Sequence, residues 1–251
     1  MRVLRAEWLK WRTVRSHWVL VILGMGIPLV VTLLTAMVRS GDRVERSSVY
    51  SLVFGASYVT AMVAGVLGAV VSAGEFGHLT IRPTFAAVPR RGAVLLAKAV
   101  LALLVGATMQ VTVAVVAAHG SFLILGWRGI QVDSSVRPPT TVLVSSVVFV
   151  ALMTMLGHAL GCLMRSAPLS ITTIILWPLL VESIVGALIA LSTDSMTVGA
   201  WMPFQAGFRM LEYGQLDLGG GPGRLSAGLY FGGVALGVTL LSSAVTARRD
   251  A

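Results

Sequence analysis

The sequence has little of what soluble proteins depend on. Only 12% of its 251 residues are charged, and the single cysteine, Cys162, lies within an apolar run. A lone cysteine forms neither an intramolecular disulfide nor a thiolate metal site. A hydrophobic content of 56% and a mean hydropathy of +0.88 exclude a soluble domain.

Motifs for catalysis and nucleotide binding are missing as well. The glycine-rich run 219–226 lacks the lysine of a phosphate-binding P-loop, and the sequence has only two lysines, Lys10 and Lys98. There is no HExxH pair and no Gly-x-Ser-x-Gly elbow, and the four histidines are not spaced as metal ligands. We therefore expect a protein that is not an enzyme and that binds no cofactor or metal ion itself.

Six apolar runs are present instead, each long enough to cross a membrane. A helical span needs about 20 apolar residues to cross a hydrocarbon core about 30 Å thick. We expect one all-α transmembrane domain over 1–251, because the connectors are too short for a separate catalytic domain. The predicted spans are 18–38, 52–73, 92–118, 141–163, 169–191 and 225–247.

Three spans carry local signals of packing or bending. Gly157 and Gly161 form a GxxxG pair in the fourth span, which is a weak signal because such pairs are common in apolar helices. Trp177-Pro178 predicts a kink in the fifth span. The second span has a stripe of small residues that favours close contact with another helix, namely Ala61, Ala64, Gly65 and Gly68.

Two segments outside the spans are also patterned as helices. Residues 1–17 form a predicted basic amphipathic helix on the membrane surface. A secretory signal is the alternative, but the apolar run that follows is longer than a typical signal and has no clear cleavage site. The segment 201–213, between the fifth and sixth spans, places Phe204, Phe208 and Leu211 on one face.

The most informative stretch is 74–98, GEFGHLTIRPTFAAVPRRGAVLLAK, a charged segment between two apolar runs. Thr80 suits the N-cap of a short helix. Ile81, Phe85 and Val88 recur at helical spacing and give that helix one apolar face. Such a helix either lies in the lipid interface or binds a soluble partner, and we favour the second interpretation.

Counts of lysine and arginine predict the orientation. With the N-terminus in the cytoplasm, the inner segments carry 12 cations against seven outside, and three acids against six outside. We therefore expect a multi-pass plasma-membrane protein with both termini in the cytoplasm, and with Asp42, Asp133 and Asp217 outside. The inner cations are Arg2, Arg5, Lys10, Arg12, Arg15, Arg82, Arg90, Arg91, Lys98, Arg165, Arg248 and Arg249.

Glu182 is the one acidic residue deep within a predicted span. A carboxylate at the centre of a span costs about 2.5–3.5 kcal/mol to insert, so such residues face a protein interior or a cavity. Two roles stay open for Glu182: substrate binding or gating, and a structural hydrogen bond to a neighbouring helix.

The order of these features resembles the membrane permeases of ABC exporters for drugs and polysaccharides, which have the type V exporter fold. The sequence TIRPTFAAVPRR is most similar to small actinobacterial permeases, and the segment 201–211 lies where the family has re-entrant helices. Leu79 departs from the pattern, since many members carry glycine there. The motif resembles the family's Glu-x₃-Gly-Thr…Pro-x-Arg…Lys and consists of Glu75, Thr80, Phe85, Pro89, Arg90, Arg91 and Lys98.

The resemblance implies that residues 74–91 contain a coupling helix that contacts a separate ATPase subunit. Each complex would hold two ATPase subunits, which bind the ATP, and two permeases, either identical or related. Drugs, peptides and lipids are all compatible substrates, and no nucleic acid is expected. The contact residues implied are Glu75, Thr80, Ile81, Arg82, Phe85, Arg90 and Arg91.

An ATP-independent transporter or channel with six spans is the alternative. Inverted repeats or several charges within the membrane would favour it. The sequence has no clear repeat, and Glu182 is the only acidic residue deep in a predicted span.

Overall fold

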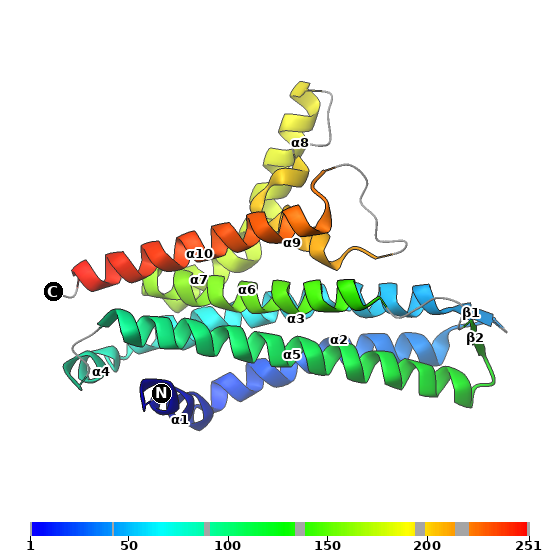
Figure 1. Ribbon diagram of the computed structural model, residues 1–251, viewed down its shortest axis with the longest axis horizontal. Helices are drawn as coiled ribbons and strands as arrows, with labels where there is room; N and C mark the ends of the chain where they lie inside the picture. The colour runs from blue at the N-terminus through cyan, green and yellow to red at the C-terminus, as the bar shows by residue number, and fades with distance from the viewer. Residues whose placement is uncertain are drawn as a thin grey trace.

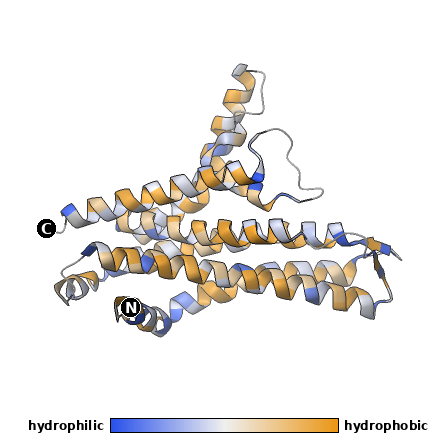
Figure 2. Ribbon diagram, viewed as in Figure 1, coloured by the Kyte–Doolittle hydropathy of each residue, from blue (hydrophilic) through white to orange (hydrophobic). Residues whose placement is uncertain are grey.

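The computed structural model describes residues 2–41, 43–87, 91–133, 139–193, 199–213 and 221–249. These ranges contain six candidate membrane-spanning helices, which confirms the predicted all-α membrane fold. The long helices run side by side as a bundle (Figure 1). Figure 2 shows apolar residues along the length of these helices, with hydrophilic residues more frequent toward their ends.

The first half of the chain contributes three candidate spans and a short helix between the second and third. Its helices are α1 (Arg2–Thr13), α2 (Arg15–Val38), α3 (Arg46–Gly77), α4 (Ile81–Ala87) and α5 (Arg91–Trp127). The third span, α5, completes this half. Two short strands, β1 (Arg43–Glu45) and β2 (Gln131–Asp133), pair in parallel with Val44 opposite Val132.

The second half contributes three spans, of which the fifth is broken into pieces. Its helices are α6 (Thr140–Met164), α7 (Ala167–Leu176), α8 (Glu182–Thr193), α9 (Pro203–Phe208) and α10 (Arg224–Arg249). A π-helical turn, Trp177–Val181, joins α7 to α8, and 3₁₀ turns at Gly199–Trp201 and Arg209–Leu211 flank α9.

Helices α3 and α5 are longer than the predicted spans 52–73 and 92–118. Apolar windows mark only the part of a helix that matches the hydrocarbon core, whereas these helices continue beyond it. The β1–β2 pair, beside the start of α3 and the end of α5, was not predicted, because three-residue strands carry too little pattern to detect. Val44 of this pair is buried against the helix ends.

The first helix, α1, is shorter than the predicted 1–17, because Val14 adopts an extended conformation (φ −90°, ψ 114°) and α2 begins at the next residue. The last carbonyls of a helix have no partner within it. Here the Nδ1 of His17 donates to the carbonyl of Trp11 at 3.0 Å, and the indole of Trp18 donates to the carbonyl of Arg12 at 3.0 Å. Side chains from the start of α2 therefore complete the end of α1.

The closest helix crossing in the bundle joins α3 and α6 through small residues. A Cβ added to Gly157 would overlap the carbonyl oxygen of Gly65, and one added to Gly161 would lie 2.6 Å from the carbonyl oxygen of Ala69. Only glycine permits backbones to approach this closely. The predicted small-residue stripe on α3 is confirmed, and the GxxxG pair of α6 forms the other side of the crossing.

A polar contact inside the bundle ties three spans together. The side-chain nitrogen of Gln110 on α5 donates to the hydroxyl of Ser57 on α3 at 2.7 Å and to that of Ser146 on α6 at 3.2 Å. All three residues are buried. Interhelical hydrogen bonds of this kind fix the rotation of helices about their axes in an apolar environment.

The predicted kink in the fifth span is present as the π-helical turn at Trp177–Val181. Pro178 has no backbone N–H and therefore interrupts the hydrogen-bond ladder at this place. Figure 1 shows α8 leaving the direction of α7 and rising away from the bundle. The kink thus brings Glu182, the first residue of α8, beside the segment that contains α9.

The segment around α9 packs on the bundle through aromatic side chains. Phe204, Phe208 and Leu211 are all buried, as their spacing predicted. The ring centroids of Phe208 and Phe149 are 5.6 Å apart, and those of Phe204 and Phe231 are 5.9 Å apart. The segment is therefore held between α6 and α10.

Candidate functional site

The turn from α3 to α4 contains a strained residue. Leu79 has a φ of +57°, in the left-handed region. For a residue with a Cβ, this conformation costs roughly 1–2 kcal/mol. The position is the one at which the sequence departs from the family's glycine, so the geometry explains why glycine suits it. The hydroxyl of Thr80 donates to the carbonyl of Glu75 at 3.4 Å and ties the turn to the end of α3.

The apolar face of α4 is present, but it packs on this chain. Ile81 and Phe85 are 6% and 9% exposed, and they lie in a cluster with Val94 and Leu95 of α5 and with Cys162 of α6. We expected these two residues to insert into a partner. In the structure they instead hold α4 against the bundle. Helical spacing predicts that a helix has an apolar face, but it does not predict which surface covers that face.

The arginines of the predicted contact set are placed only in part. The guanidinium carbon of Arg91 lies 5.6 Å from the centre of the Phe85 ring, within the range of a cation–π contact. Arg90 and the side chain of Arg82 lie outside the described residues, as do the predicted helix end at Pro89 and the apolar position Val88.

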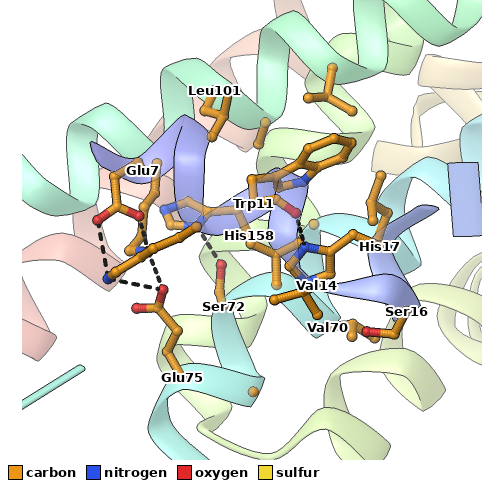
Figure 3. Close-up of a pocket in the computed structure, with 18 of the residues that line it drawn as sticks. Glu7, Trp11, Val14, Ser16, His17, Val70, Ser72, Glu75, Leu101 and His158 are labelled. Atoms are coloured by element: carbon orange, nitrogen blue, oxygen red, sulfur yellow. Dashed lines mark hydrogen bonds and ion pairs between the residues drawn. The ribbon is translucent and has the colours of Figure 1, made fainter. Parts of the chain in front are cut away.

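Both lysines of the sequence meet two glutamates at this end of the bundle. Lys98 of α5 is paired with Glu75 of α3 at 2.6 Å and with Glu7 of α1 through a closer contact. Lys10 of α1 lies 3.5 Å from both glutamates and donates to the hydroxyl of Thr84 on α4 at 2.7 Å. Figure 3 shows Glu7 and Glu75 approaching from different helices, with dashed lines for the ion pairs that their carboxylates make with lysine nitrogen. We call these four residues, Glu7, Lys10, Glu75 and Lys98, the charge cluster.

Three of the four side chains in the charge cluster are largely shielded from solvent, so each of these charged groups depends on its ion-pair partners to offset the loss of water. The side chains of Lys98 and Glu7 are each 4% exposed and that of Glu75 is 16% exposed, whereas Lys10 is 41% exposed. Two carboxylates and two ammonium groups balance in charge. Burying such charges is favourable only while they remain paired.

Two of the four residues of the charge cluster, Glu75 and Lys98, were part of the quoted motif, but their pairing was not predicted. Glu75 was expected to contact a separate ATPase subunit. It pairs with Lys98 and Lys10 of its own chain. Glu7 was missed, although it is the single acidic residue of a basic helix, which is the signal that could have revealed it.

A cavity of about 440 Å³ adjoins the charge cluster and lies among α1, α3, α5 and α6 (Figure 3). Trp11, Leu67 and Leu101 contribute apolar walls. At its buried end, the hydroxyl of Ser72 and the Nδ1 of His158 are 2.5 Å apart. Within the described ranges, no group of three or more histidine, cysteine or acidic side chains is placed to hold a metal ion.

Glu182 lies at a second polar site, far along the chain from the charge cluster. Its carboxylate is buried and accepts hydrogen bonds from the backbone N–H groups of Phe204, at 3.0 Å to each oxygen, and of Gln205, at 2.9 Å. These are the unpaired amides at the start of α9, and a carboxylate suits that end of a helix. The geometry favours the structural role, and a role in gating stays a prediction.

The described residues include six apolar helices that are long enough to cross a membrane, and such a bundle defines a multi-pass membrane protein. A family model described as ABC-2 family transporter protein matches residues 3–181, which is 179 of the 251 residues. The chain therefore belongs to this family and is the permease component of an ABC transporter. The match includes α1, α4 and the whole charge cluster. No curated protein matches the sequence.

Proposed function

We propose that this permease lines the path of an ABC exporter as a dimer, with a second copy or a related permease. Two separate ATPase subunits bind the ATP and contact α4 and the turn before it. The carrying observation is that α4 is bound to the bundle on both sides, through Phe85 to α5 and through Thr84 to Lys10 of α1. A partner that moves α4 therefore moves α1 and α5 with it.

The proposed docking surface is the outward side of α4 and the preceding turn. Pro83 and Ala86 are exposed on α4, and His78, Leu79 and Thr80 are exposed in the turn. Ile81 and Phe85 lie on the opposite side, so their role in the proposal is to transmit movement. A helix that only floated in the interface would turn its apolar face toward lipid. Because that face is buried against the bundle, α4 is expected to move together with the bundle rather than float in the lipid interface.

The experiment co-expresses the permease with its ATPase subunit and measures co-purification and substrate-stimulated ATP hydrolysis. Ala86→Arg adds bulk and charge to the proposed surface and is expected to weaken co-purification about tenfold or more, the size of a lost interface hot spot. Phe85→Ala is expected to retain co-purification and lower the stimulation. Val111→Ala, at an exposed position of α5, is the control. Unchanged co-purification for Ala86→Arg refutes the docking surface.

The proposed orientation places both termini and α4 in the cytoplasm of a plasma-membrane protein, as the charge counts favour. Single cysteines at Thr80 and Asp133 in a Cys162→Ser background test it with a reagent that does not cross membranes. The cysteine at Asp133 is expected to react in intact cells, and that at Thr80 only after lysis. The reverse pattern overturns the orientation. Transport by the permease without any ATPase would favour the channel-like alternative.

A further inference from the structure

The cavity beside the charge cluster has a polar mouth and an apolar interior. Its exposed rim includes Thr13 and Ser16 from the α1–α2 connection and His78 and Thr80 from the α3–α4 turn. Further in, it is lined by buried apolar side chains, among them Leu67, Leu101 and Val105. Its volume of about 440 Å³ falls within the roughly 300–1,000 Å³ typical of small-molecule sites.

One carboxylate oxygen in this wall has an unused hydrogen-bonding capacity. Glu75 uses Oε1 for both Lys98 and Lys10. Its Oε2 is buried and has no hydrogen-bond partner among the residues that the structure describes. A buried acceptor without a partner costs about 1–3 kcal/mol. A ligand that brings a donor to this oxygen recovers that cost.

Lys10 contacts the other oxygen of this carboxylate, Oε1, and it does so weakly. Its ammonium group lies 3.5 Å from each glutamate, and its side chain is 41% exposed. Lys98, by contrast, is buried and in closer contact with both carboxylates. A partly exposed ion pair contributes at most about 1 kcal/mol, so a second cation displaces Lys10 at little cost.

We propose that this cavity binds an amphiphile with a primary ammonium group. The ammonium donates to Oε2 of Glu75 and, as a second cation, displaces the weakly held Lys10 from the same carboxylate. The apolar part lies along Trp11, Leu67 and Leu101. An anion fits poorly, because both buried carboxylates would face it and Lys98 is already paired with them. All the residues of the site belong to one chain, so it is tested on the permease alone, without the ATPase that is proposed to cover His78 and Thr80 at the rim.

Two sources supply this chemistry, a lipid with an ethanolamine headgroup and a soluble amine. The probe is radiolabelled n-octylamine, with binding measured to the full-length permease in phosphatidylcholine nanodiscs and corrected for empty nanodiscs. Saturable binding that unlabelled octylamine displaces and n-octanol does not is the expected result. Competition by added phosphatidylethanolamine assigns the site to a lipid headgroup, and absence of competition assigns it to a soluble amine.

Three variants decide whether the probe occupies this cavity. Ala102→Phe fills part of the cavity while the four residues of the charge cluster stay unchanged, and it is expected to weaken binding at least tenfold. Leu104→Phe, at an exposed position of the same helix, is expected to leave binding unchanged. Lys10→Met removes the competing cation and is expected to tighten binding by up to about fivefold. No saturable binding, or equal binding to Ala102→Phe and Leu104→Phe, overturns the proposal, as does weaker binding to Lys10→Met.

Discussion

Replacing each lysine by methionine tests how far the bundle depends on the charge cluster. Among the described residues, Lys98 is the one partner within 3 Å of Glu7 and Glu75, and the side chains of Lys98 and Glu7 are each 4% exposed. Lys98→Met leaves the two carboxylates near each other, and among their described partners only the partly exposed Lys10, at 3.5 Å from each, remains. Removing one partner of a buried ion pair costs about 3–5 kcal/mol.

Lys10→Met is the matched control, because the same chemical change is made on a side chain that is 41% exposed. It removes two ion pairs of 3.5 Å and the hydrogen bond to Thr84, for an expected loss of about 1 kcal/mol. The measurement is thermal unfolding of the purified permease in detergent. We expect the larger fall in melting temperature for Lys98→Met by a clear margin.

A second substitution separates charge from packing. Glu7→Gln in the Lys98→Met background removes one of the two unbalanced carboxylates and is expected to restore part of the lost stability. The same change alone leaves Lys98 paired with Glu75 and costs less than Lys98→Met. Equal losses for the two lysine variants, or a further loss when Glu7→Gln is added, would refute this reasoning.

Three other predictions concern the fold. Gly157→Leu forces α3 and α6 apart and is expected to cost about 1–3 kcal/mol of stability or to abolish folding. Gly233→Leu on α10 is the control and is expected to be tolerated, because an added Cβ there meets nothing within 4 Å among the described residues. Thermal unfolding of both variants in detergent measures the contrast. Glu182→Ala leaves two buried amides unpaired and is expected to cost about 1–3 kcal/mol for each, while Glu182→Gln keeps an acceptor and costs less; equal melting temperatures would contradict the capping role. Leu79→Gly removes the strain of the left-handed conformation. After the entropy cost of the added glycine is subtracted, the change is expected to raise stability by about 0.5–1 kcal/mol. A lower melting temperature would contradict this prediction.

The six spans were predictable because each is a long apolar run, and that signal is local. The kink at Trp177-Pro178 was predictable for the same reason, since the missing N–H is a property of one residue. The aromatic face of 201–213 also followed from spacing alone. The exact ends of α1, α3 and α5 were not predictable, because they depend on local breaks in the chain such as the extended residue Val14 between α1 and α2.

The site was harder to predict, since it is made by contacts between distant segments. Spacing gave α4 an apolar face with Ile81 and Phe85, but the surface that covers this face belongs to α5 and α6. The pairing of Glu7 with Lys98 joins residues 91 positions apart. No periodicity links two such residues, and only the packing of α1 against α5 brings them together.

The long separation of that pair has a consequence for how the protein is made. Glu7 leaves the ribosome early, whereas its counter-ion, Lys98, is supplied by the third span. Until then Glu7 has only the partly exposed Lys10 of its own helix among its described partners, and a carboxylate paired in this way favours contact with water. We therefore expect the N-terminal helix to remain at the aqueous boundary until the third span has inserted, so that its packing on the bundle marks the completion of the first three spans.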